Sequence, residues 1–196
     1  MERKLASKYY INSLEGDKYS KKDQTMLLVV DEQPKLMKTM ENGELTILNT
    51  LVLIKAFKEY QMPILATEQY PKGLGKSDQR LLEEIPEDKI FEKTIFDAAI
   101  PEVLDFIKEN NITNVVVVGA EGHVCVYQTV RTLLDLGLNV FFVKDAISSY
   151  TEELKETSAN LLGQMGAAVV NTEMLLFDIA YAVSYTHLTL PTICSV

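Results

Sequence analysis

Three side chains that could carry out covalent chemistry stand at or near the ends of apolar runs: Asp31, Lys93 and Cys125. A thiol can attack a carbonyl carbon, a carboxylate can take the thiol proton, and an ammonium group can stabilise the ions that form. Each residue also has an ordinary structural interpretation, as a turn residue, a surface lysine and a small buried core residue respectively. The three residue types therefore indicate nucleophilic catalysis only if the fold brings them together.

Cys125 is predicted to lie just inside a helix that leaves the glycine-flanked turn 119–122. The free N–H groups and the macrodipole at a helix N-terminus favour an anion, and thiolates in such positions have pKa values of about 3.5–7.5. The helix start therefore favours a thiolate at Cys125. His123 lies only two residues away, so on a helix its side chain points away from the cysteine. We expect His123 to line a pocket rather than to act as a general base.

Apolar runs that suit buried strands alternate with helical patterns along the chain. Strands are predicted over residues 26–30, 63–67, 89–96, 115–118, 140–143 and 167–170. Helices are predicted over residues 45–60, 80–83, 101–110, 123–136, from a capping box at Ser149–Glu152 to Gly166, and from 172 to about 181. This alternation predicts one α/β domain with a mainly parallel six-stranded sheet and helices on both faces.

The carboxyl ends of parallel strands are where open α/β sheets bind their ligands. This rule predicts that Asp31, Lys93 and the turn before Cys125 lie in one crevice. Glu68 and Gln69, at the end of the second strand, either contact a substrate there or lie on a surface loop. The chain has two histidines and no Asp-x-His or His-x-x-His pattern. We therefore expect neither a metal nor a cofactor.

The amino-acid composition and two sequence patterns argue against several classes of binding partner. Lys and Arg number 19 against 28 Asp and Glu, a net charge of −9 that argues against binding of nucleic acid. Residues 73–77 end like a phosphate-binding loop, but Tyr70 stands where its first glycine is needed. The longest uncharged stretch, 179–196, is too polar to span a membrane. Two cysteines build no disulfide framework, which suits the cytoplasm. We expect a small-molecule substrate.

Four sequence blocks, with a fifth that is similar, resemble the isochorismatase-like cysteine hydrolase family. They occur in the family's order between residues 26 and 182: Leu27–Gln33, Thr67–Gly75, Phe91–Phe96, Val118–Val126 and Asp145–Ser149. The block Thr67–Gly75 is similar to the isochorismatase-domain-containing branch. The resemblance implies a three-layer α/β/α sandwich (Rossmann-like) and, by family analogy, a homo-oligomer.

The resemblance also implies a catalytic triad of Cys125, Asp31 and Lys93. It implies a cis peptide between Ala120 and Glu121, in the turn before the cysteine. Backbone N–H groups of Glu121 and Cys125 would then form an oxyanion hole. The expected reaction is cleavage of a small amide or related C–N bond through a thioester. The alternative is a catalytically silent binding module that keeps the fold, against which the presence of all three triad residues speaks.

The blocks contain further residues that we expect to contact the substrate: Gln33, Glu68, Gln69, Tyr70, Phe96 and His123. Two departures from the family matter. Thr67–Gln69 replaces the Asp-x-His pattern of nicotinamidases, so nicotinamidase activity is not expected. Gly122 stands where relatives often have threonine, which loosens the turn beside the nucleophile.

The last residues differ abruptly in composition from the rest of the chain. Residues 183–196 carry no charge and are rich in serine and threonine. They resemble the translation of a transposase sequencing adapter, and we interpret them as a non-native tail; a genuine terminal segment is the alternative. Without them the chain keeps one cysteine and one histidine. We divide the chain into an N-terminal extension, a hydrolase domain and this tail, over residues 1–25, 26–182 and 183–196.

Overall fold

The computed structural model describes residue 11 and residues 21–180. The predicted tail, with Cys194 and His187, lies outside the described residues, as does most of the predicted N-terminal extension. The proposed domain boundaries therefore stay a prediction. Among the described residues, no helix is long and apolar enough to cross a membrane.

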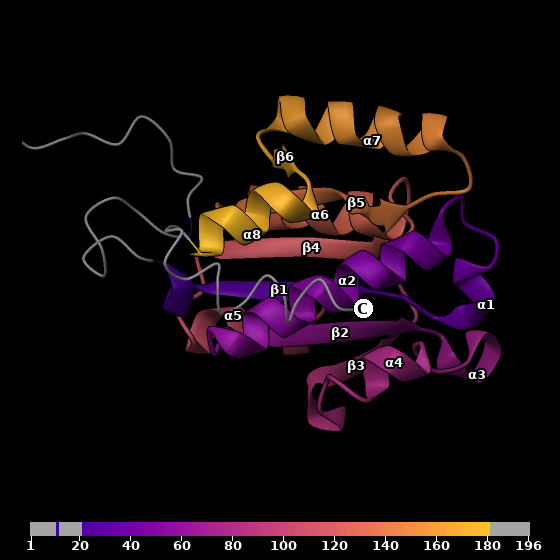
Figure 1. The fold of residues 1–196 in the computed structure, drawn as a ribbon, viewed down its shortest axis with the longest axis horizontal. Helices are drawn as coiled ribbons and strands as arrows, with labels where there is room; N and C mark the ends of the chain where they lie inside the picture. The colour runs from indigo at the N-terminus through magenta and orange to yellow at the C-terminus, as the bar shows by residue number, and fades with distance from the viewer. Residues whose placement is uncertain (1–10, 12–20, 181–196) are drawn as a thin grey trace, which may run out of the picture.

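The six predicted strands form one sheet in which all described pairings are parallel (Figure 1). The strands are β1 (Thr25–Val30), β2 (Ile64–Gln69), β3 (Ile90–Lys93), β4 (Asn114–Ala120), β5 (Asn139–Ser148) and β6 (Ala168–Val170). Their order across the sheet is β3-β2-β1-β4-β5-β6. The chain therefore starts in the middle, moves to one edge and then crosses to the other, which makes β1 and β4 the point where strand order reverses.

Helices cover both faces of the sheet, which confirms the three-layer α/β/α sandwich. They are α1 (Pro34–Met37), α2 (Gly43–Glu59), α3 (Pro71–Leu74), α4 (Gln79–Leu82), α5 (Pro101–Glu109), α6 (Cys125–Asp135), α7 (Glu152–Met165) and α8 (Thr172–Ala180), with 3-10 turns at Lys22–Gln24 and Glu87–Lys89. Residues of α2 and α8 share one core cluster, and residues of α5, α6 and α7 share the other (Figure 1).

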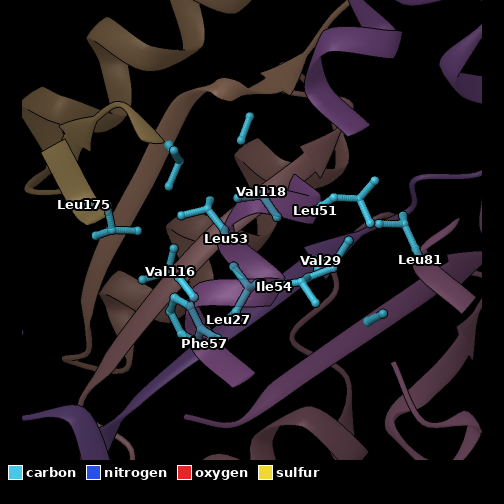
Figure 2. Packing of buried hydrophobic residues seen from close by; sticks show 14 of the residues in the cluster. Leu27, Val29, Leu51, Leu53, Ile54, Phe57, Leu81, Val116, Val118 and Leu175 are labelled. Atoms are coloured by element: carbon cyan, nitrogen blue, oxygen red, sulfur yellow. The ribbon is translucent and has the colours of Figure 1, made fainter. Parts of the chain in front are cut away.

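The central strand β1 is buried along its whole length because both faces of the sheet are covered. Leu27 and Val29 belong to the α2 side, where Figure 2 shows them with Phe57 of α2. Met26 and Leu28 belong to the α6 side. Successive side chains of a strand point to opposite faces, so the residues that follow β1 are also divided between two different environments.

The predicted capping box is wrong in one respect. The first turn of α7 is capped by Thr151, whose side chain accepts a hydrogen bond from the Leu154 N–H at 3.3 Å. Ser149 does not cap the helix, because β5 is longer than predicted and Ser149 follows its buried end at 1% exposure. The sequence interpretation also missed α1 and α3, which have four residues each and are too short to show a helical period.

Candidate active site

A glycine allows β1 and β4 to end side by side. Gly119 has φ +113°, and a Cβ atom there would lie 2.1 Å from the carbonyl oxygen of Val30. Any other residue would both strain the backbone and collide with β1. This close approach brings the turn that follows β4 next to Asp31, the first residue after β1.

Lys93 is buried and ion-paired, not at the surface. Its Nζ lies 2.6 Å from Asp31 Oδ2, and both side chains are fully buried. The ammonium group also donates to Gln69 Oε1 at 2.6 Å and to the carbonyl oxygens of Ile95 and Phe96 at 3.2 and 2.9 Å. Its three hydrogens are therefore occupied by the protein, so Lys93 serves as a fixed cation beside Asp31.

Asp31 is held by three different groups. Besides the ion pair with Lys93, its Oδ1 accepts a hydrogen bond from Thr67 Oγ1 at 2.8 Å, and the thiol of Cys125 hydrogen-bonds to the same carboxylate. Burial raises the pKa of Asp31, and Lys93, Thr67 and Cys125 each oppose that rise. A carboxylate that is both in contact with a thiol and more basic than usual is suited to accept the thiol proton.

Cys125 is the first residue of α6 and is 2% exposed. Burial, with a smaller contribution from Asp31, raises the pKa of its thiol to about 12; Lys93 and the N–H of Glu121 act in the opposite direction. The expectation that the helix start favours a thiolate is therefore wrong, because desolvation and a neighbouring carboxylate outweigh the helix dipole. The resting thiol is protonated, and its proton has to leave as the sulfur attacks.

The turn before the nucleophile has the predicted backbone form. The Ala120–Glu121 peptide is cis, and the N–H of Glu121 hydrogen-bonds to the sulfur of Cys125. The carbonyl oxygen of Glu121 accepts from the N–H groups of Val124 and Val126, both at 3.0 Å. This places one of the two predicted oxyanion donors beside the sulfur; the oxyanion hole itself stays a prediction.

Two of the residues expected to contact substrate form hydrogen bonds with the scaffold. The amide of Gln33 accepts from the Gln69 N–H at 2.8 Å and donates to the carbonyl oxygens of Gln69 and Gly75 at 3.0 and 2.5 Å. Glu68 accepts from the Ser77 N–H at 2.6 Å. Side chains alternate along β2, so Glu68 faces away from the Asp31 side, where Gln69 and its strand neighbour Thr67 lie.

The other predicted contact residues lie nearer the surface. Tyr70 and Phe96 are about half exposed, and Tyr70 lines a cavity of about 440 Å³ that Lys93 and Ile95 also border. The His123 ring packs edge-on against Tyr150, with ring centroids 5.2 Å apart. The side chain of Gln69 accepts a hydrogen bond from the Lys93 ammonium group and so helps to hold that group in place.

Sequence reasoning missed two residues of the site. Thr67 was recognised only as part of a sequence block, although it shares a strand face with Gln69 and so could have been placed by the two-residue alternation of a strand. Tyr150, which donates a hydrogen bond to the Glu121 carboxylate, is distant in sequence and no local pattern identifies it. Among the described residues, no group of three or more His, Cys, Asp or Glu could hold a metal ion.

The fold and the site together define a three-layer α/β/α protein with a cysteine, a carboxylate and a lysine at the switch point of its sheet. The family model of the isochorismatase domain matches residues 25–174. Isochorismatase family protein 1A of Dictyostelium discoideum is 33% identical over 160 residues, covering 79% of this chain and 78% of the relative. The chain therefore belongs to the isochorismatase family, and this membership identifies it in general terms as a hydrolase.

Solved structures agree with this assignment. The MAR1 ribonuclease from Caenorhabditis elegans superposes with a TM-score of 0.83 and 32% identity, covering 89% of this chain and 91% of its own. The YcaC protein of Escherichia coli, described as an octameric hydrolase of unknown specificity, has a TM-score of 0.82 at 20% identity over 88% of this chain and 87% of its own, and shows the fold alone. A relative in Phytophthora sojae, 34% identical over 67% of this chain and 65% of its own, is a secreted effector.

Proposed function

We propose that this protein is a cysteine hydrolase that cleaves an amide or related C–N bond of a small molecule through a thioester intermediate. One observation carries the proposal: the thiol of Cys125 is hydrogen-bonded to Asp31, which is itself ion-paired with Lys93 at 2.6 Å. A nucleophile in contact with its base, and a base in contact with a fixed cation, is the arrangement that covalent catalysis requires.

The reaction proceeds in two halves. Asp31 accepts the thiol proton while the sulfur of Cys125 bonds to the carbonyl carbon, and the N–H groups of Glu121 and Cys125 hold the oxygen that becomes negative. Protonated Asp31 gives its proton to the nitrogen as the C–N bond breaks and the amine leaves. Water then attacks the thioester with Asp31 as the base, which releases a carboxylic acid and restores the thiol. Lys93 stabilises the negative charge of Asp31 in the steps in which this residue is deprotonated.

A second candidate is cleavage of RNA, because a relative of similar length is described as a ribonuclease. The charges disfavour it in this chain. The net charge is −9, and a phosphodiester at Cys125 would meet the carboxylate of Asp31. A thiol activated by a carboxylate is suited to carbonyl carbon, so we favour the amide.

The decisive experiment follows the thiol itself. Purified protein is incubated with a panel of small amides, ureido compounds and carbamates, and ammonia or amine release is measured together with intact mass after acid quenching. We expect turnover of at least one compound and a transient acyl adduct, both abolished in Cys125→Ala. Cys194→Ala, the matched control for the other thiol, is expected to retain both.

The alternatives give different results in the same assay. Absence of turnover and adduct with every compound would favour the silent binding module. A short single-stranded RNA included in the panel is expected to stay intact; its cleavage by wild-type protein but not by Cys125→Ala would favour the ribonuclease. A homo-oligomer and a cytoplasmic location complete the proposal, and light scattering and cell fractionation check them.

A further inference from the structure

Glu121 belongs to the turn that leads into the nucleophile, and its carboxylate has no role in the proposed reaction, which uses only the backbone of this residue. Glu121 is 8% exposed, and its carboxylate accepts a hydrogen bond from the hydroxyl of Tyr150. The ion pairs found among the described residues do not include Glu121. A buried carboxylate without a cation is costly, so a partner that arrives with the ligand would be favoured there.

The charges around the nucleophile do not balance. Lys93 neutralises Asp31, whereas Glu121, in the turn that precedes Cys125, has no ion-pair partner among the described residues. The hydroxyl of Tyr150 is held in its neutral form, because its hydrogen bond to Glu121 raises the pKa of the phenol. The phenol therefore adds no second negative charge beside Glu121.

Another acid lies close to Tyr150 in the fold. Glu41 donates its backbone N–H to the carbonyl oxygen of Ser149, and its carboxylate accepts from the Glu152 N–H at 2.6 Å, which places another acid near Tyr150. Lys155, in the first turn of α7, is ion-paired with Glu152 at 2.8 Å. A ligand that approaches Cys125 along Tyr150 thus passes the carboxylate of Glu41 as well.

Unsatisfied polar atoms converge on the same turn. Ser149 is 1% exposed and its Oγ has no hydrogen-bond partner among the described residues. A Cβ atom added at Gly122 would lie 2.8 Å from that oxygen, so the hydroxyl faces the turn that holds the nucleophile. The buried Nδ1 of His123 likewise lacks a partner in the described part of the chain. The turn beside Cys125 therefore keeps hydrogen-bonding capacity that the described residues do not use.

We propose that Glu121 and Tyr150 form the specificity subsite for a positively charged nitrogen group, so that the substrate is a small amide that also carries an ammonium or guanidinium group. The carboxylate of Glu121 supplies the opposite charge, and the half-exposed ring of Tyr150 offers a π face to the cation. Substrates with a carboxylate in this position are rejected by like charge. This inference deepens the proposed function, on which it rests for the reaction but not for the binding.

The test uses Cys125→Ala protein, which binds but does not react, and three amides of nearly equal size. β-Alaninamide carries an ammonium group, butanamide is its neutral counterpart and succinamate is its anionic counterpart. Affinities are measured by isothermal titration at neutral pH and low salt. We expect β-alaninamide to bind at least tenfold more tightly than butanamide, and succinamate to bind more weakly than both.

A second substitution assigns the preference to one side chain. Cys125→Ala with Glu121→Gln is expected to bind β-alaninamide and butanamide equally. Glu109→Gln in the same background removes an exposed carboxylate from the end of α5 and is expected to change neither affinity. Equal binding of the three amides by Cys125→Ala protein, or a cation preference that persists without Glu121, would overturn the inference.

The two proposals fail in distinguishable ways. If the cation preference depends on Glu121 but protein with an intact Cys125 neither turns over nor forms an adduct, the subsite stands and the hydrolase proposal fails. If neutral amides are hydrolysed as fast as cationic ones, and Glu121→Gln changes their kcat/KM equally, the hydrolase stands and the subsite fails. A purely structural role of Glu121 would produce that second pattern.

Discussion

Asp31 and Glu32 are consecutive, fully buried carboxyl groups on opposite sides of the sheet, and their surroundings differ in one respect. Asp31 has the Lys93 ammonium at 2.6 Å, whereas the side chain of Glu32 has one hydrogen-bond partner in the described part of the chain, the hydroxyl of Thr50, which donates to its Oε1 at 2.5 Å. Burial raises the pKa of Glu32 to about 8, with a smaller contribution from the charge of Asp78. At neutral pH Glu32 is therefore mostly protonated.

Burial raises the pKa of both carboxyl groups, and the two residues differ in what opposes that rise. A cation within ion-pair distance favours the charge on the α6 side of the sheet, and its absence from the immediate contacts of Glu32 leaves a neutral acid on the α2 side. The first is equipped to exchange a proton with Cys125. The second belongs to the support of the site, since the carbonyl oxygen of Glu32 accepts from the Asp78 N–H at 2.9 Å.

The largest effect is expected from removing Lys93, the cation that distinguishes the surroundings of Asp31 from those of Glu32. Lys93→Met leaves Asp31 buried without its ammonium partner, and we expect a loss of about 3–5 kcal/mol in the free energy of unfolding together with loss of all turnover. Urea unfolding and the amide assay measure the two effects. Lys58→Met, which removes the exposed pair with Glu84, is the control and is expected to cost at most about 1 kcal/mol. A stable, active Lys93→Met protein would refute the assignment of Lys93.

The neutral acid is tested by the pH dependence of stability. The folded protein holds the Glu32 proton more tightly than the unfolded chain, so this residue lowers stability progressively as pH rises from about 4.5 to about 8, by at most roughly 5 kcal/mol, and not further above that range. Glu32→Gln removes this titration. We expect the variant to gain stability over wild type across the same pH window, measured by urea unfolding at pH 5, 6, 7 and 8; parallel curves would contradict the raised pKa.

A smaller effect is expected when the hydroxyl groups that donate to Asp31 and Glu32, those of Thr67 and Thr50, are removed one at a time. Thr67→Val removes a hydrogen bond that favours the ionised form of Asp31, so the pKa of Asp31 rises further and the acid limb of the pH–rate profile moves to higher pH, by about one unit. Thr50→Val removes the corresponding bond to Glu32 and is expected to leave that limb in place. Equal shifts in both variants would mean that the limb reports global stability instead of Asp31.

The sequence predicted the strands well because six short apolar runs, several of them rich in β-branched residues, suit a sheet that is buried on both faces. The order of the strands was not predicted, since alternation of strands and helices is compatible with several arrangements. The four-residue helices α1 and α3 were missed; proline at the first position of each, Pro34 and Pro71, was the available signal. Ser149 was misread because the length of β5 depends on pairing with β4.

The meeting of Asp31, Lys93 and Cys125 was predictable, because the carboxyl ends of parallel strands share one edge of the sheet. The protonation state of Cys125 was not, since the helix start is visible in the sequence whereas burial of the thiol against Asp31 is a property of the packed molecule. Glu68 was expected to contact the substrate, and its side chain accepts a hydrogen bond from the Ser77 N–H. Ser77 lies nine residues further along the chain, and the sequence does not specify how that segment folds back on β2.

The side chain of Gln33 has a consequence for how the molecule ages. Its amide exchanges two hydrogen bonds with the main chain of Gln69, as the peptide groups of an adjoining strand would, and donates another to the carbonyl oxygen of Gly75. Deamidation replaces the nitrogen with oxygen, which would set a negative charge against the carbonyl oxygens of Gln69 and Gly75. A change of one atom would then turn two attractions into two repulsions, next to the strand that carries Thr67 and Gln69.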